Sequence, residues 1–106
     1  MNRLPDISIE EALRLGYPLT RKSAYPRFGE KFFTRTATVL KGRFWEKKTL
    51  RQIAFEMGYL SFERIRQIEA IGCRLVRAYL KSLDCYDEKQ DVEPFIMHTQ
   101  AFKEDV

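Results

Sequence analysis

The sequence predicts an all-α protein of four main helices in total, beginning with a short N-terminal helix and ending in an acidic C-terminal tail. Apolar residues between residues 31 and 82 recur at spacings of three and four, which is the period of one face of a helix. Two capping boxes stand where helices would begin, and glycines stand where two of them would end. A β-strand anywhere within residues 31–82 would contradict this prediction.

The first helix is expected at residues 8–15. Ser8 and, three residues later, Glu11 form a capping box, and Gly16 is suited to end the helix in a left-handed conformation. Residues 17–29 contain two prolines and a glycine, so we expect irregular chain there.

A helix is expected at residues 31–44, where these apolar residues share a face: Phe33, Ala37, Val39, Leu40 and Phe44. A polar break at residues 45–48 precedes Thr49, which forms a second capping box with Gln52. The next helix is expected at residues 50–57, and its apolar residues are Leu50, Ile53, Ala54 and Met57. Gly58 is suited to end it.

The longest helix is expected at residues 62–82, with Ser61 as its N-cap. Its apolar stripe consists of Ile65, Ile68, Gly72, Leu75, Val76 and Tyr79. Residues 84–93 are acidic and lack this period, and the apolar residues 94–98 precede a polar end. The pattern is compatible both with a tail that docks on the domain and with a loose end.

The chain length allows one compact domain. We expect an N-terminal helix and irregular connection at residues 1–30, a helical domain at residues 31–83 and an acidic tail at residues 84–106. No apolar run reaches the ~20 residues of a membrane span, and the N-terminus lacks the apolar segment of a signal peptide. Two cysteines are too few for a disulfide scaffold or a zinc site. These features predict a cytoplasmic protein.

The net charge of +4 is distributed unevenly along the chain. Residues 21–81 carry fifteen basic and five acidic side chains, a net charge of +10, whereas residues 82–106 carry −5. A basic block of this density favours binding to nucleic acid. Lysine and arginine side chains displace the counterions of the nucleic acid's phosphates, and the release of these counterions favours binding. An ordinary solvated helical surface is the alternative interpretation.

The helix at residues 50–57, the turn at residues 58–61 and the basic helix at residues 62–82 have the pattern of a helix-turn-helix. In this motif the first helix braces across the DNA backbone, and the start of the second enters the major groove. Ser61 as N-cap also leaves backbone N–H groups available to a phosphate. A helical hairpin that packs only against protein is the alternative.

Residues 63–70, ERIRQIEA, are similar to the recognition helix of region 4 of the sigma-70 family, which binds the −35 promoter element. The resemblance extends to residues 49–54, TLRQIA, and to the spacing of residues in the preceding helix: Arg35, Ala37, Val39, Leu40, Arg43 and Phe44. It covers about residues 33–77 and implies a DNA-binding helix-turn-helix.

The resemblance implies that Glu63, Arg66 and Gln67 contact base edges in the major groove. Their chemistry agrees, because arginine suits guanine, glutamine suits adenine and glutamate accepts from cytosine N4. Phe62 is a fourth candidate, since an aromatic ring suits a thymine methyl group or a protein pocket. The candidate phosphate contacts are Lys48, Arg51, Ser61, Arg64, Arg74 and Arg77. The base-contacting face should be exposed, with Ile65 and Ile68 pointing inward.

The sequence departs from the family pattern at three points. Phe62 stands where the family usually has an arginine, the turn at residues 58–61 is one residue longer than the commonest form, and nothing before residue 30 resembles the region that melts the −10 element. A role as a complete sigma factor is therefore not expected.

The leading hypothesis is a stand-alone, nucleoid-associated transcription regulator that binds double-stranded promoter DNA together with bacterial RNA polymerase. The resemblance implies a contact with the β flap of the polymerase core. The apolar candidates for this contact are Phe32, Phe33, Leu40, Phe44 and Trp45. For each of them, a place in the core of the domain is the favoured interpretation. The alternative is a protein-binding sigma mimic that does not recognise DNA sequence: a polymerase co-factor, an inhibitor or half of a split sigma factor. Phe62 and the acidic tail favour that alternative.

An enzyme is not expected, and neither is a cofactor, a metal or a small-molecule ligand. His98 has no cysteine or paired carboxylate near it in the sequence, and no glycine-rich phosphate loop or metal-ligand spacing occurs. Cys73 lies on the longest helix, where a half-buried packing role is favoured over a nucleophile. Residues 82–106 are expected to compete with DNA for the basic face, because a tethered acidic segment has a high effective concentration there.

Overall fold

The computed structural model describes residues 3–20, 29–58 and 61–102, and no β-strand occurs within these ranges. Its α-helices are α1 (Ile9–Gly16), α2 (Glu30–Phe44), α3 (Leu50–Glu56), α4 (Phe62–Ser82) and α5 (Glu93–Phe102), and a short 3-10 helix, η1 (Tyr17–Leu19), follows α1. The all-α fold class is therefore confirmed, with one helix more than the sequence predicts. None of the described helices is long and apolar enough to cross a lipid bilayer.

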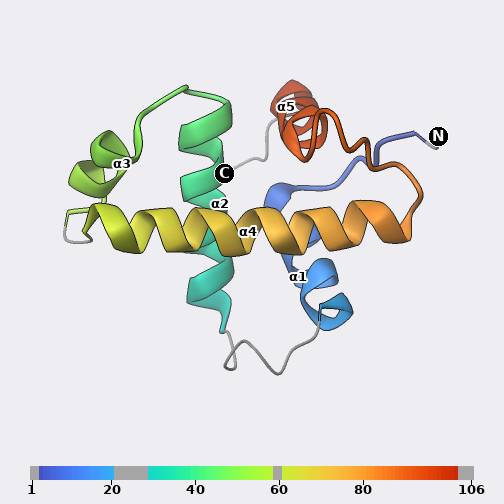
Figure 1. Ribbon diagram of the computed structural model, residues 1–106, viewed down its shortest axis with the longest axis horizontal. Coiled ribbons are helices and arrows are strands. Elements are labelled where there is room, and N and C mark those ends of the chain that lie inside the picture. The colour runs from blue at the N-terminus through green and yellow to red at the C-terminus, as the bar shows by residue number, and fades with distance from the viewer. Residues whose placement is uncertain (1–2, 21–28, 59–60, 103–106) are drawn as a thin grey trace.

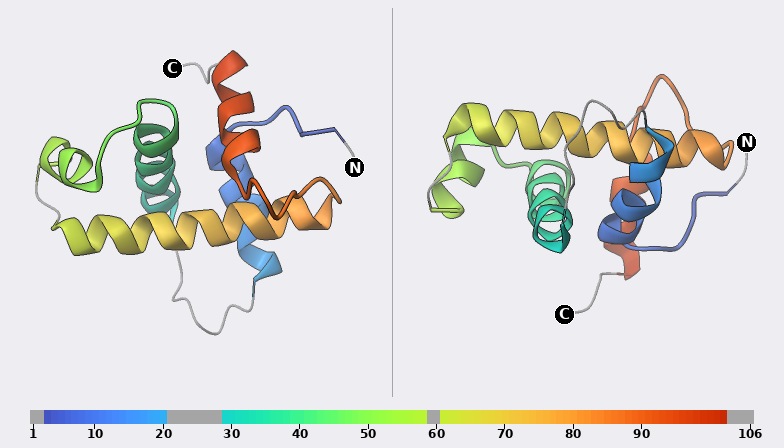
Figure 2. Two further views of the ribbon diagram at one scale, coloured as in Figure 1. Left: turned by 45° about the horizontal axis from the view of Figure 1, so that its top comes forward. Right: turned by 90° about the horizontal axis from the view of Figure 1, so that it is seen from below.

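The longest helix, α4, runs along the long axis of the molecule (Figure 1). α1 and α2 both pack across it on one side, and α3 packs near its start (Figure 2). As a result, α3 and the start of α4 lie at one end of the molecule, away from α1 and α5.

A small hydrophobic cluster fixes α3 against α2 and against the first turns of α4. It consists of Val39, Ile53, Ala54, Ile65 and Ile68, with Leu50 and Met57 packed beside it. These side chains are the apolar stripes that the sequence predicts for the three helices. The cluster sets the angle between the two helices of the motif, because each helix buries one stripe against the others.

The capping signals of α3 and α4 are confirmed. Thr49 Oγ1 accepts a hydrogen bond from the Gln52 backbone N–H at 3.1 Å, and the Thr49 N–H donates to Gln52 Oε1 at 2.8 Å. Ser61 Oγ accepts from the Arg64 N–H at 3.1 Å. Gly58 adopts a left-handed conformation (φ +81°) after α3, as predicted. The predicted length of the turn depends on residues 59–60, which lie outside the described residues.

The larger hydrophobic cluster joins both ends of the described chain to α2 and α4. Leu13 of α1, Leu40 of α2, Leu75 of α4 and Phe95 of α5 are all fully buried in it. Helices α1 and α5 thus share one core with α2 and α4.

Gly16 allows α1 to lie directly against the backbone of α4. Its conformation is right-handed (φ −78°, ψ −26°) and the chain continues into η1, so the expected left-handed helix end at this glycine is wrong. A Cβ atom on Gly16 would clash with the carbonyl oxygen of Leu75. The close approach of two helices, rather than a turn, requires glycine here. Gly72 has the same role where α4 crosses α2, since its Cβ would stand 2.5 Å from Thr36 Cγ2.

Helix α5 occupies part of the segment that the sequence predicts as an acidic tail. Val92, Phe95 and Ile96 are fully buried, and Trp45 Nε1 donates a hydrogen bond of 2.8 Å to the Ile96 carbonyl oxygen. The sequence is compatible with a docked tail and with a loose end. The structure shows a docked helix over residues 93–102. The apolar residues 94–98 supply most of the buried face.

Candidate nucleic-acid interface

The first two turns of α4 divide sharply into a buried face and an exposed face. Ile65 and Ile68 are buried in the smaller cluster, while Glu63, Arg64, Arg66 and Gln67 are exposed. This pattern agrees with the expectation for a helix whose start enters a groove. This face belongs to the end of the molecule that α3 and the start of α4 form (Figure 1).

Glu63 and Arg66, two of the predicted base contacts, are bound to each other. Arg66 donates from Nε to Glu63 Oε1 at 3.1 Å and from Nη2 to Glu63 Oε2 at 2.5 Å. This hydrogen bond lowers the pKa of Glu63 and raises that of Arg66. Both side chains are more than half exposed. The free-energy cost of separating such an exposed pair in water is small. Each of the two side chains can therefore leave the other and bind a base edge instead.

Phe62, the first residue of α4, is held at the tip of the helix by an arginine from α3. The Arg51 guanidinium carbon lies 5.3 Å from the centroid of the Phe62 ring. The ring is nevertheless 43% exposed, which is unusual for a large apolar side chain in this structure. The contact brings a predicted phosphate contact and a predicted base contact together.

The remaining predicted phosphate contacts fall into two groups, of which the first is accessible. Arg64 and Arg74 are both exposed on α4. Ser61 Oγ accepts the cap hydrogen bond from the Arg64 N–H, so its own O–H and the other backbone N–H groups at the helix start can still donate to an anion. Ser61 and Arg64 lie at the start of α4, whereas Arg74 lies about three turns further along the helix. A phosphate backbone that follows α4 would meet both places.

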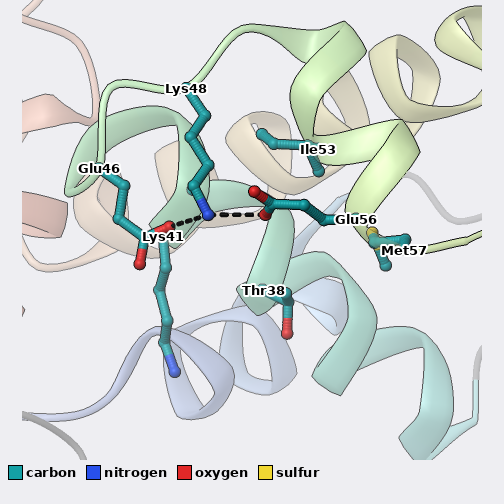
Figure 3. A pocket seen from close by; sticks show the side chains of 8 residues that line it. Thr38, Lys41, Glu46, Lys48, Ile53, Glu56 and Met57 are labelled. Atoms are coloured by element: carbon teal, nitrogen blue, oxygen red, sulfur yellow. Dashed lines mark hydrogen bonds and ion pairs between the residues drawn. The ribbon is translucent and has the colours of Figure 1, made fainter.

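Lys48 belongs to the second group, whose side chains are only partly exposed and form ion pairs with carboxylates of the protein. Its ammonium group lies 2.8 Å from Glu46 Oε1 and 2.6 Å from Glu56 Oε1. Figure 3 shows the side chain reaching between these two carboxylates along the groove that separates α2 from α3. The hydrogen bonds that Lys48 donates to Glu46 and Glu56 raise the pKa of its ammonium group. Lys48 links the loop after α2 to α3, and its contact with a phosphate stays a prediction from the sequence.

Arg77 is also engaged within the protein. It donates from Nε and Nη2 to the two oxygens of Asp91 at 2.9 and 3.0 Å, which raises its pKa. Lys47 forms a longer ion pair of 3.7 Å with Glu93. The acidic segment therefore pairs with the far half of α4 and with the loop after α2. In the part of the chain that the structure describes, no acid beyond residue 82 pairs with Arg51, Arg64 or Arg66, so the expected competition has no contact there to support it.

The apolar candidates for a polymerase contact lie mainly in the core. Phe33 and Leu40 are buried, and Phe32, Phe44 and Trp45 are half-buried against the larger cluster. The sequence analysis missed a more accessible side chain, Phe55 of α3, which is 85% exposed. Its position opposite the apolar stripe of α3 was the available signal.

Burial raises the pKa of both cysteine thiols. Desolvation raises the pKa of the Cys73 thiol to about 12, so it stays protonated and is a poor nucleophile. Cys85 is buried, and its pKa is raised for the same reason. Within the described ranges no group of three metal-ligating side chains occurs.

A comparison with protein families found a match for the helix-turn-helix region. The family described as Sigma-70, region 4 matches residues 34–78, which run from the second turn of α2 to the last third of α4 and include every predicted DNA contact. Comparisons with curated proteins and with solved structures gave no match. The matched family is a DNA-binding regulatory domain and not a family of enzymes. Residues 34–78 of this chain, with the α3–α4 motif at their centre, match the sigma-70 region 4 family of DNA-binding helix-turn-helix domains.

Proposed function

We propose that this protein is a transcription regulator that binds promoter DNA in the major groove through the start of α4, in association with bacterial RNA polymerase. The observation that supports it is the exposed face formed by Glu63, Arg66 and Gln67, directly opposite the buried Ile65 and Ile68. These three residues supply the hydrogen-bonding groups that discriminate base pairs in the major groove. In this role the protein acts in the cytoplasm, at the nucleoid.

The proposed contacts divide into base recognition and backbone attachment. Phe62, Glu63, Arg66 and Gln67 face the bases. The proposed phosphate contacts are the backbone N–H groups after Ser61, and the side chains of Arg51, Arg64 and Arg74. Lys48 and Arg77 are left out, because their charges are neutralised by Glu46, Glu56 and Asp91.

Selection of duplexes from a random library, followed by binding measurements, tests this proposal. Arg66→Ala should weaken binding to the selected site about ten- to a hundredfold and relax the preference at one base pair. Arg74→Ala serves as the matched control, since a lost phosphate contact weakens binding to selected and scrambled duplexes by the same factor. Failure of the full chain to enrich any sequence would overturn the proposed DNA recognition.

One observation favours the second candidate function, a protein-binding mimic of region 4. Phe55 is 85% exposed on α3, and a groove of about 350 Å³ lies between α2 and α3, with Gly42, Ile53 and Met57 among its lining residues. An exposed aromatic ring of this kind is typical of a protein contact. Capture of core RNA polymerase by the full chain, with Phe55→Ala and Arg66→Ala as variants, separates the two functions. Loss of capture only with Phe55→Ala, together with no sequence preference on DNA, would favour the mimic.

A further inference from the structure

Phe62 differs from every other residue at the exposed start of α4 because its side chain has no hydrogen-bonding group. It is the first residue after the N-cap Ser61, and it precedes Glu63, whose carboxylate is bound by Arg66. Most large apolar side chains of the described helices are buried, but this ring stays 43% exposed. Leaving an aromatic ring in water has a free-energy cost unless a partner covers it.

The ring is also held in place before any partner arrives. The Arg51 guanidinium carbon lies over the ring, 5.3 Å from its centroid, and a cation over an aromatic face is an attractive contact. Because the guanidinium has five N–H donors, those that do not face the ring can still donate hydrogen bonds to a phosphate. Arg51 therefore fixes Phe62 and brings a positive charge to the same point at the helix tip.

In the major groove, the chemical feature that an aromatic ring recognises is a methyl group. Guanine, adenine and cytosine present hydrogen-bonding groups there, whereas thymine adds the methyl group on C5. A phenyl ring gains apolar contact with that methyl group and leaves the polar groups of the other bases unsatisfied. Phe62 thus complements Glu63, Arg66 and Gln67, whose expected partners are hydrogen-bonding groups of cytosine, guanine and adenine.

We propose that Phe62, positioned by Arg51, gives this protein a preference for the C5-methyl group of one thymine next to the base pairs contacted by Glu63 and Arg66. The inference rests on the proposed major-groove binding and adds to it the identity of one base and the residue that selects it. A pocket on a protein partner is the competing occupant for the ring, and the test below includes it.

The test uses the full chain and the DNA site that it selects from a random library. Selection is repeated with Phe62→Ala, and the base pair whose preference disappears marks the position of the ring. Replacing the thymine at that position by uracil removes only the methyl group and leaves base pairing intact. Wild-type binding should weaken about fourfold, the value expected for one buried methyl group. Phe62→Ala should bind the thymine and uracil duplexes equally.

Two matched controls isolate the ring and its support. Phe55→Ala removes an exposed phenylalanine of the neighbouring helix and should keep the full thymine-to-uracil difference. Arg51→Ala should reduce that difference and also weaken the salt dependence of binding, because one phosphate contact is lost.

Each outcome decides between the proposals. A selected site at which the wild type tolerates uracil at every thymine would overturn this inference and leave the proposed function intact. Absence of any selected sequence would overturn both. If Phe62→Ala keeps the wild-type site but loses capture of core RNA polymerase, the ring binds protein and the inference is wrong.

Discussion

Arg77 of α4 and Asp91, two residues before α5, are joined by two hydrogen bonds, of 2.9 Å from Nε and 3.0 Å from Nη2. The Tyr86 hydroxyl donates a third hydrogen bond, of 2.7 Å, to the same carboxylate. These contacts attach the segment after α4 to the far half of that helix. Since α5 begins at Glu93, the ion pair supports the docking of the C-terminal helix and lies away from the end that we propose to contact DNA.

Replacing Asp91 by asparagine is expected to lower the free energy of unfolding by about 0.5–1 kcal/mol at pH 7. The figure is small because both side chains are a third or more exposed and water screens the pair. The Arg77 hydrogen bond lowers the pKa of Asp91 in the folded protein. A carboxyl shifted in this direction stabilises the fold above its unfolded pKa, near 4, and loses that contribution as the pH falls through the folded value.

Urea unfolding of the wild type and of Asp91→Asn at several pH values checks this prediction. The difference between the two proteins should be constant above pH ~5 and should narrow below pH ~4. A difference that stays the same down to pH ~2.5 would show that packing, and not the charge of Asp91, is responsible.

Gly16→Ala should destabilise the fold by about 1–3 kcal/mol, the usual cost of forcing an extra carbon into a packed contact. The added Cβ would meet the backbone carbonyl of Leu75, which cannot move without displacing α4 from α1. Gly29→Ala is the matched control, because no atom lies within 4 Å of its added Cβ. Thermal unfolding of both variants gives the comparison. Equal melting temperatures would contradict the close packing of α1 on α4.

The salt dependence of DNA binding should separate Arg74 from Arg77. Each phosphate contact contributes about 0.9 to the slope of log affinity against log salt concentration on duplex DNA. Arg74→Ala should therefore reduce the slope by about one contact. Arg77→Ala should leave the slope unchanged, because Asp91 already neutralises that guanidinium, and should lower the melting temperature instead. A reduced slope for Arg77→Ala would contradict this prediction and show that Arg77 contacts a phosphate.

The helix-turn-helix was predictable because its signals are local. The capping box of Thr49 and Gln52, the left-handed Gly58 and the cap at Ser61 each depend on residues at most three positions apart. The fold of the motif then requires only that the apolar stripes of α3 and α4 pack against each other. Burial of Ile65 and Ile68 fixes which face of α4 is left exposed.

The remaining features depend on contacts between distant residues. The hydrogen bond from Trp45 to Ile96 spans 51 positions, and it helps to place a helix whose acidic start obscures its apolar face in the sequence. The partner of Arg77 lies 14 positions away, across a bend that no local motif fixes. For the same reason a glycine such as Gly16, which is required for contact with α4, was mistaken for one required by a turn.

Glu63→Gln should change affinity and specificity in opposite directions. In the free protein Arg66 holds the pKa of Glu63 below its usual range, so the carboxylate is ionised throughout the neutral range. Removing this charge reduces repulsion by phosphates and frees Arg66 from its partner, so binding to scrambled duplexes should tighten. A glutamine amide accepts fewer hydrogen bonds than a carboxylate and also donates, so the preference for a cytosine at one position should weaken. Binding of both proteins to the selected site, to the site with that cytosine replaced and to a scrambled duplex measures both effects at one salt concentration. If Glu63→Gln tightens binding to all three duplexes by the same factor, Glu63 makes no base contact. Its carboxylate then acts only by repelling phosphates and by pairing with Arg66.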